Sequence, residues 1–393
     1  MTAGTPDAAV WDGVSTLLDH YIRIRPDDRV VLLYTADARD PAAWVAAELA
    51  VRGVRPALLG MSAGRDDTVE PRLRAALPDP ASPHPRIVLL TMERDSMSHV
   101  LQLRRALAPY PEDRWATYRV INASAEFFRH SMGVTPELLS ALNGALLNRM
   151  MPASRLRVTS GGGTDLEIAV DSERYRWISN RGVWRAGAFL VLPPGEVSTY
   201  PADVNGVLVA DGAFNVTSYT GHDVRLADHP VTVEIEHGRV TGAACADPLV
   251  ARLLERCLRV ENADLIGELG FGTNVGTTAF IPLNSHINER HPGVHLGLGM
   301  HGQRLDVVDY WCDVHLDLIA ADATVAVDGR TEIRSADLRG FAGERHPEPL
   351  TGNVHEEDID GDCCGLITGE VARAREEFLR TRECRRTRAT GGS

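Results

Sequence analysis

The sequence contains no lysine, because all 41 basic residues in its 393 positions are arginine. A Walker A loop, a pyridoxal-phosphate Schiff base and a serine–lysine dyad each require a lysine amine, so these three mechanisms are excluded. No run of 18 apolar residues occurs, and the first dozen residues have neither a basic start nor an apolar stretch. We therefore expect no membrane span and no signal peptide.

Basic residues are also fewer than acidic ones. The formal net charge is −13, and no basic cluster is longer than the RRTR near the end of the chain. A protein that binds nucleic acid through its phosphates needs a basic surface, so we expect no nucleic-acid partner. The six cysteines include no CxxC pair. This pattern favours reduced thiols in a cytoplasmic protein and argues against a thiolate zinc site.

The length and the hydrophobic patterning predict two domains. Residues 1–150 alternate between strands and helices, as in an α/β domain with parallel pairing, and residues 151–393 have a strand-rich α+β pattern that ends in a frayed tail after about residue 380. In the first domain we expect strands near 30–33, 58–59 and 87–90, and helices over 41–53, 100–107 and about 124–147. In the second we expect strands at 156–159 and 166–170, a hairpin at 231–240 and a helix after 248.

The strongest chemical signal is the segment Val314-His315-Leu316-Asp317-Leu318. In a strand, alternate side chains point to opposite faces, so His315 and Asp317 share one face and the apolar residues the other. An imidazole and a carboxylate held together on a rigid strand make a metal-ligand pair. The pattern alone is equally typical of a half-buried strand with two polar residues turned outward.

Three further residues extend this pattern. His295 stands opposite the apolar residues of a second strand, where Gly297 and Gly299 leave its face open, and Glu196 and Glu268 lie among apolar residues and glycines. A glutamate in such surroundings is costly unless it is paired or bound to a metal. Together with His315 and Asp317, these residues predict a site for two divalent ions bridged by one carboxylate. Mixed oxygen and imidazole ligands suit Zn, Co, Mn or Fe(II).

The segments around these residues resemble a known family. LPPGEVSTYP, GELGFGTN, NERHPGVHLGLG and DVHLDLI are similar, in this order, to segments of the aminopeptidase T and aminopeptidase S metallopeptidases, and SGGGTDLEIAV resembles the strand before them. The resemblance runs from about residue 10 to about residue 335. It implies an N-terminal Rossmann-like domain, a C-terminal catalytic domain and a homodimer. It also implies a ligand set for two divalent ions: Glu196, Glu268, His295, His315 and Asp317.

The same resemblance indicates which residues act in catalysis. Glu268, or an unliganded carboxylate near it, would serve as general base. The family's Asp-Glu-Lys segment corresponds here to Asn288-Glu289-Arg290, which makes Glu289 a second candidate for a catalytic residue. The family tyrosine expected after the histidine has no counterpart in residues 300–303, and His301 is the candidate to replace it.

The sequence therefore predicts a metal-dependent aminopeptidase-type hydrolase that cleaves an amide or peptide bond next to a free amino group, with a small metabolite or a short peptide as substrate. Two alternatives stay open. One is a mononuclear Fe(II) oxygenase related to the dihydroxypyridine ring-cleaving dioxygenase of the same superfamily, in which a histidine stands at the position of Glu268. The other is a non-catalytic homologue that binds a metal or ligand.

Access to the site depends on assembly. Trp177, Trp184 and Phe189 precede Glu196 closely in the sequence. Such aromatics belong more often to a core than to an interface. If they formed a dimer interface, their side chains would enclose one side of the site and restrict it to small substrates.

Overall fold

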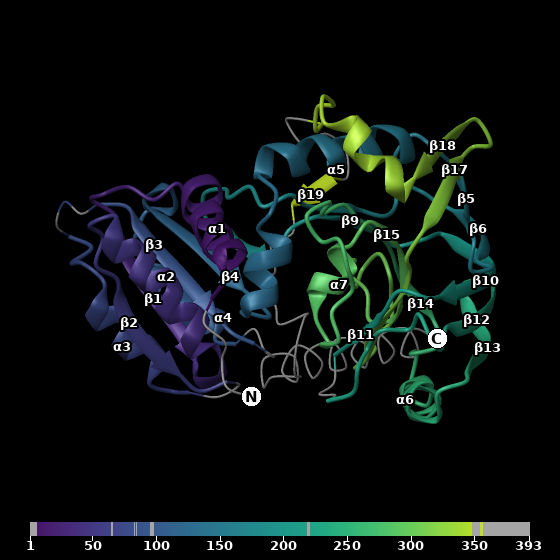
Figure 1. Cartoon of the computed structure of the whole chain (residues 1–393), viewed down its shortest axis with the longest axis horizontal. Coiled ribbons are helices and arrows are strands. Elements are labelled where there is room, and N and C mark those ends of the chain that lie inside the picture. The colour runs from purple at the N-terminus through teal and green to yellow at the C-terminus, as the bar shows by residue number, and fades with distance from the viewer. Residues whose placement is uncertain are drawn as a thin grey trace, which may run out of the picture.

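The computed structural model describes residues 6–63, 66–81, 83, 85–94, 98–217, 221–347 and 354–356. These residues form two lobes, one built on a parallel sheet with helices on both faces and a larger one built on two further sheets (Figure 1). The fold is thus mixed α/β, as the sequence predicts. The frayed tail expected after about residue 380 lies outside the described residues.

The smaller lobe contains a five-stranded parallel sheet in the order β2-β1-β3-β4-β8. Its strands are β1 (Arg29–Thr35), β2 (Ala57–Met61), β3 (Ile87–Met92), β4 (Trp115–Val120) and β8 (Phe189–Leu192). The three strands expected near residues 30, 58 and 87 are therefore confirmed.

Helices cover both faces of this sheet. They are α1 (Ala8–Thr16), α2 (Arg39–Val51), α3 (Val69–Ala76) and α4 (Val100–Leu107), with short helical turns at Leu17–Ile22, Ala36–Ala38, Glu112–Arg114 and Phe127–Ser131. Because side chains alternate along β1, Leu32 packs with Val45 of α2 on one face and Leu33 packs with Leu73 of α3 on the other. Both faces of the sheet are therefore buried, as is usual for a parallel sheet.

The larger lobe is a sandwich of two seven-stranded sheets, ordered β13-β12-β10-β6-β5-β17-β18 and β11-β16-β15-β14-β9-β7-β19. The first sheet contains β5 (Arg155–Ser160), β6 (Asp165–Ala169), β10 (Asp203–Ala210), β12 (Val231–Glu236), β13 (Arg239–Cys245), β17 (Ala323–Val327) and β18 (Thr331–Arg334). The second contains β7 (Trp177–Asn180), β9 (Glu196–Thr199), β11 (Phe214–Val216), β14 (Ile266–Gly272), β15 (Gly293–Gly299), β16 (His315–Ala320) and β19 (Val354–Glu356). All pairs are antiparallel except β7 with β19. Leucines and valines of both sheets form one core between them.

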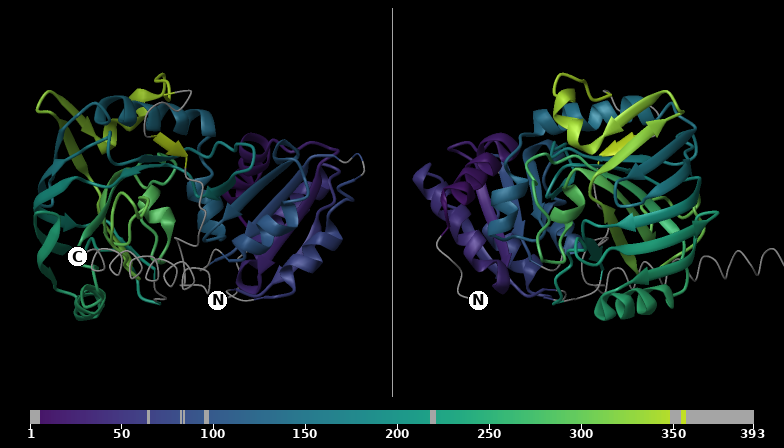
Figure 2. Two further views of the ribbon diagram at one scale, coloured as in Figure 1. Left: turned by 180° about the vertical axis from the view of Figure 1, so that it is seen from behind. Right: turned by 45° about the vertical axis from the view of Figure 1, so that its right-hand side comes forward.

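The remaining helices pack against this sandwich (Figure 2). They are α5 (Pro136–Met150), α6 (Pro248–Leu258), α7 (His286–Arg290) and a short helical turn at Ser335–Phe341. The helix expected over about 124–147 is interrupted, because Pro136 lacks the amide hydrogen needed to continue a preceding helix and instead starts α5, which Thr135 caps.

The chain passes between the two lobes more than once. The α5 residues Leu142 and Leu146 belong to the sandwich core, whereas β8, from beyond residue 150, completes the parallel sheet. Each side of the predicted boundary at residue 150 thus contributes to both lobes. This crossing places the loop after β8, which leads to Glu196, beside the second sheet of the sandwich.

Two expectations about the surface can be compared with the structure. Trp177, Trp184 and Phe189 pack into three different apolar clusters, so among the described residues they do not form one continuous aromatic wall. No helix in the described part of the chain is long and apolar enough to cross a membrane.

Candidate metal centre

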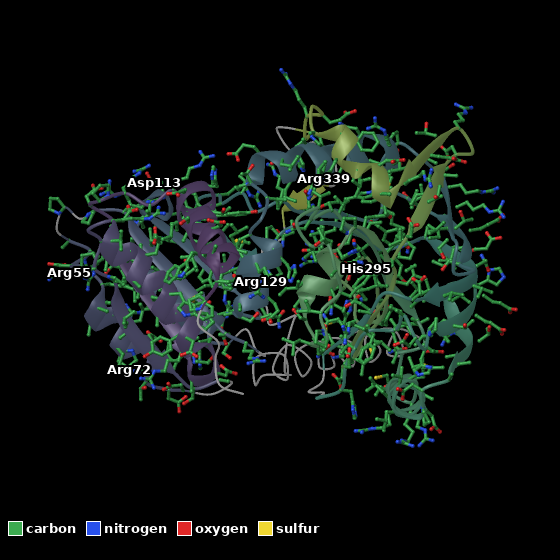
Figure 3. All side chains as sticks on the ribbon, in the orientation of Figure 1. Arg55, Arg72, Asp113, Arg129, His295 and Arg339 are labelled. Carbon is green, nitrogen blue, oxygen red and sulfur yellow. The ribbon has the colours of Figure 1, made fainter. Side chains whose placement is uncertain are left out.

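The histidine and aspartate strands predicted from the sequence are neighbours in the second sheet. β15 pairs antiparallel with β16, so that Gly297 lies opposite Asp317. The leucines and valines of both strands point into the sandwich core, whereas His295, His315 and Asp317 point to the opposite face. Figure 3 labels His295 in the interior of the larger lobe, close to α7. The alternation in the sequence therefore orients all three side chains as predicted.

Glu268 reaches the same face through an irregularity in β14. The pairing of β14 with β15 shifts register between Ile266 and Glu268, which places Glu268 opposite Gly297. A β-bulge of this kind re-aims a side chain and is common beside active sites. Gly267 lies inside the bulge, where a Cβ would overlap the main chain of Met300.

Glu196 is the first residue of β9, and the Pro-Pro-Gly segment before it sets its position. Gly195 has φ of +111°, and a Cβ there would lie 2.8 Å from the main-chain nitrogen of Asn274. Only glycine combines this conformation with so close an approach. The Asn274 amide donates to the Pro194 carbonyl at 2.9 Å and fixes the turn.

The five predicted ligands form two groups that share Glu268. Glu196, Glu268 and His295 make one group, and Glu268, His315 and Asp317 make the other, with the potential ligand atoms of each group within 4.8 Å of one another. We call these the Glu196 half and the Asp317 half. A carboxylate shared between two such groups is in a position to bridge two cations.

Short contacts link the members of each half. In the Glu196 half, His295 Nε2 lies 2.9 Å from Oε1 of Glu196. In the Asp317 half, His315 Nε2 lies 3.0 Å from Oδ1 of Asp317 and 3.2 Å from Oε2 of Glu268. The side chains of Glu268 and His315 remain 20% and 16% exposed, whereas those of His295 and Asp317 are 1% exposed. The centre is thus open on the side of Glu268 and His315.

Two observations show that divalent cations suit this cluster. Both carboxylate oxygens of Asp317 are buried, Oδ2 has no partner and Oδ1 has only the contact with His315 Nε2, which is costly unless a cation neutralises the carboxylate. Glycines also keep the space clear, because a Cβ at Gly270 would overlap His295, and one at Gly297 would lie 2.8 Å from His315 Cε1 and 3.0 Å from Asp317 Oδ1. By contrast, Gly299 faces Cys312 and not the cluster.

Burial and charge shift the pKa values of the cluster in opposite directions. Burial favours a lower pKa for His295, but the Glu196 carboxylate outweighs it and raises the pKa to about 9. Burial also disfavours the ionised form of Asp317 and raises its pKa to about 7. Burial also opposes ionisation of Glu268, yet His315 lowers its pKa to about 2. Without a cation, the cluster therefore retains protons at neutral pH on groups that would be ligands.

Glu289 lies beside the cluster but in neither half. It accepts hydrogen bonds from Asn215 and, at 2.8 Å, contacts His286 Nδ1, while its Oε2 lies 3.6 Å from Arg290. Burial favours a higher pKa for this carboxyl, but His286 and Arg290 hold the pKa well below its usual value. Glu289 is therefore an ionised carboxylate close to the ligands, as the general-base prediction requires.

His301 lies farther from the ligands, in a small aromatic group. Its ring packs against Tyr310 at 4.6 Å and Tyr200 at 5.9 Å between centroids, and its Nε2 contacts the Tyr310 carbonyl at 3.2 Å. Burial lowers the pKa of His301. The described contacts thus place a neutral imidazole at the edge of the centre, outside both halves.

Sequence reasoning assigned no supporting role to the residues that hold these ligands. Arg290 is buried and donates to Oε2 of Glu196, and the main-chain carbonyl of Met300 lies 3.0 Å from His315 Nδ1. Asn215 was also missed, although its pairing opposite Asp317 brings it to Glu289. The only sequence signal was the position of Arg290 next to Glu289.

Comparison with solved structures supports the fold. The chain is similar to 2,5-dihydroxypyridine dioxygenase from Pseudomonas putida KT2440, with a TM-score of 0.55 and 14% identity over 83% of this chain and 95% of that chain. It is also similar to AmpT, aminopeptidase T, from Thermus thermophilus, with a TM-score of 0.52 and 14% identity over 83% of this chain and 97% of that chain. The chain shares the fold of both proteins.

Sequence comparison gives a different match. The model of a family described as crocagin biosynthetic protein CgnE/B matches residues 197–328, a segment that includes four of the five predicted ligands and begins one residue after Glu196. No curated protein sequence matches the chain. The predicted resemblance to aminopeptidase T is therefore confirmed for the fold, and the predicted activity stays a prediction.

Proposed function

We propose that this protein is a metal-dependent hydrolase of the aminopeptidase type, which cleaves an amide or peptide bond next to a free amino group. The observation that carries the proposal is the arrangement of two ligand groups around Glu268, each with one imidazole and two carboxylates. Glu196, Glu268, His295, His315 and Asp317 would hold two divalent ions, Zn, Co or Mn, which would polarise the scissile carbonyl and lower the pKa of a bound water to about 7.

The protein's own groups divide the remaining work. The proton from the water would go to Glu268 if one of its oxygens stays off the ions, or otherwise to Glu289, which belongs to neither ligand group; Glu268 is the more exposed of the two. His301, whose pKa burial lowers, is neutral at pH 7, and it would have to leave the Tyr310 carbonyl or the Gln303 amide to exchange a proton. His315 keeps one tautomer through the Met300 carbonyl and presents Nε2 to the site.

The ligand grouping favours this proposal over an iron oxygenase. A mononuclear Fe(II) oxygenase binds a single ion with two histidines and one carboxylate, all three as ligands of that ion. Among the described residues, His295 and His315 fall in different groups, and Glu268 stands between them. Similarity in fold to a dioxygenase keeps this alternative as one outcome of the test below.

The matching family model supports a specialised substrate. Its description names a biosynthetic protein, and its match covers most of the candidate centre. We therefore propose a small metabolite or a short peptide as substrate, processed by a homodimer. Light scattering tests the assembly, because a monomer at micromolar concentration would contradict the homodimer.

Turnover assays decide between the two chemistries. The purified protein, stripped of metal and reloaded separately with Zn, Co or Mn, should release aniline from aminoacyl anilides and the N-terminal amino acid from short peptides. Asp317→Asn should abolish this release, while Asp322→Asn, at an exposed position in the bend after β16, should not. No release with any of the three ions, together with oxygen uptake on loading with Fe(II) and a hydroxylated heterocycle, would favour the oxygenase. Metal binding without either activity would favour the non-catalytic homologue.

A further inference from the structure

The two halves of the candidate centre differ in how their ligands are held. In the Glu196 half, Arg290 donates to Oε2 of Glu196 while His295 Nε2 lies 2.9 Å from Oε1. Both oxygens of that carboxylate therefore already have partners. In the Asp317 half, Oδ2 of Asp317 has no partner, and Oδ1 has only the contact with His315 Nε2 at 3.0 Å.

The histidines differ in the same direction. His315 Nδ1 lies 3.0 Å from the Met300 carbonyl, which orients the ring so that Nε2 points at Asp317 and Glu268. His295 Nδ1 is buried and has no hydrogen-bond partner. Because a hydrogen bond at the second ring nitrogen orients a metal-binding imidazole and makes it more basic, His315 is prepared for a cation and His295 is not.

Arg290 itself is firmly placed. Its side chain is 2% exposed, its Nε donates to the Pro193 carbonyl at 3.1 Å, and its Nη1 lies 3.6 Å from Glu289. Its positive charge thus sits directly beside the Glu196 half. A cation bound there has to share Glu196 with a fixed guanidinium, which costs Coulomb energy in a buried site.

We infer that Arg290 is a positioning residue that makes the centre unequal: the first divalent ion binds tightly in the Asp317 half, and the second binds weakly in the Glu196 half. The inference rests on the proposed function, since it concerns the same centre. Each ion requires an imidazole and a carboxylate to separate, His315 from Asp317 at 3.0 Å and His295 from Glu196 at 2.9 Å, because ligand atoms of a tetrahedral ion lie about 3.4 Å apart. In the Glu196 half this movement has to displace Glu196 or His295. Arg290 opposes that movement by holding Glu196 through Oε2.

The test is a titration of Zn²⁺ into the metal-free full-length protein, followed by calorimetry. We expect two steps of unequal affinity. Glu196→Gln should remove the weak step and keep the tight one, whereas Asp317→Asn should remove the tight step. These two variants leave Arg290 in place, so they remain informative if an Arg290 variant does not fold.

Variants of Arg290 test its own role. Arg290→Met keeps much of the side-chain volume but removes the charge and the donor, and should tighten the second step about 10- to 100-fold while the first step stays. Arg290→Lys, which restores a charged donor, should lie closer to the parent protein. The control is Arg304→Met, where the side chain is 71% exposed.

Each contrary result has a separate meaning. Two equal steps in the parent protein, loss of the tight step in Glu196→Gln, or an unchanged second step in Arg290→Met would overturn this inference while the hydrolase proposal stands. A parent protein that binds no Zn²⁺ would overturn both. A single ion in the parent, lost in Asp317→Asn and joined by a second ion in Arg290→Met, would support the inference.

Discussion

His315 Nε2 lies 3.0 Å from Oδ1 of Asp317, two residues along the same strand, and both side chains leave the same face of β16. The contact joins an imidazole whose other nitrogen is bonded to the Met300 carbonyl to a buried carboxylate whose second oxygen, Oδ2, has no partner. The pair is therefore arranged to bind a cation between its members. Each of the predictions below depends on this cluster or its surroundings.

Loss of either member of the pair should remove metal. His315→Ala and Asp317→Ala each delete a direct ligand, so we expect less bound metal after dialysis and no measurable turnover. Elemental analysis measures the metal, and thermal unfolding checks that the variants fold. His237→Ala, at a side chain that is 87% exposed, is the control. A double variant that binds metal like the parent protein would show that the centre is elsewhere.

A single methyl group should block the centre. In Gly297→Ala the new Cβ would lie 2.9 Å from Glu268 Cβ and 3.0 Å from Asp317 Oδ1, closer than folded proteins tolerate. We expect the ligands to move and metal affinity to fall by about tenfold or more, measured against a competing chelator. Gly161→Ala is the matched control, because a Cβ at Gly161 meets no atom within 4 Å. Equal affinities in the two variants would contradict the placement of the ligands.

Glu289 and His301 should affect turnover more than metal content. Neither belongs to the two ligand groups, so Glu289→Gln and His301→Ala should retain the ions of the parent protein. If they transfer protons, kcat should fall about 10²- to 10⁴-fold with little change in KM. Steady-state kinetics and elemental analysis on the same samples provide the measurement. Loss of metal together with activity would make the residue a support for the ligands and not a proton carrier.

Metal affinity should rise with pH. The pKa of His295 in the metal-free protein is raised to about 9, so this imidazole is protonated at neutral pH and must lose its proton before it can bind a cation. Affinity should therefore fall as pH drops below about 9, and fall further below about 7, where Asp317 also takes up a proton. Calorimetry in buffers of different ionisation enthalpy counts the protons released. The same affinity and no proton release from about pH 6 to about pH 9 would contradict this assignment.

Local sequence was enough for the faces of the strands. Side chains alternate strictly along a strand, so the apolar residues around His295, His315 and Asp317 determine which way these three point, whatever the strands pair with. A different pattern, continuous apolar runs in the order strand, helix, strand, predicted the parallel strands of the smaller lobe, which are buried on both faces. The interrupted helix before α5 was missed, although Thr135 and Pro136 signal a helix start there.

The sequence alone thus determined the types of ligand and the faces from which they project, because these follow from residue chemistry and from a period of two. Only the tertiary structure decided how the ligands divide into two halves. Glu196 and His295 are 99 positions apart, and they meet because β9 and β15 both pair with β14. The bulge at Glu268 and the contact of Arg290 with Glu196 likewise depend on packing between distant segments, which no local pattern records.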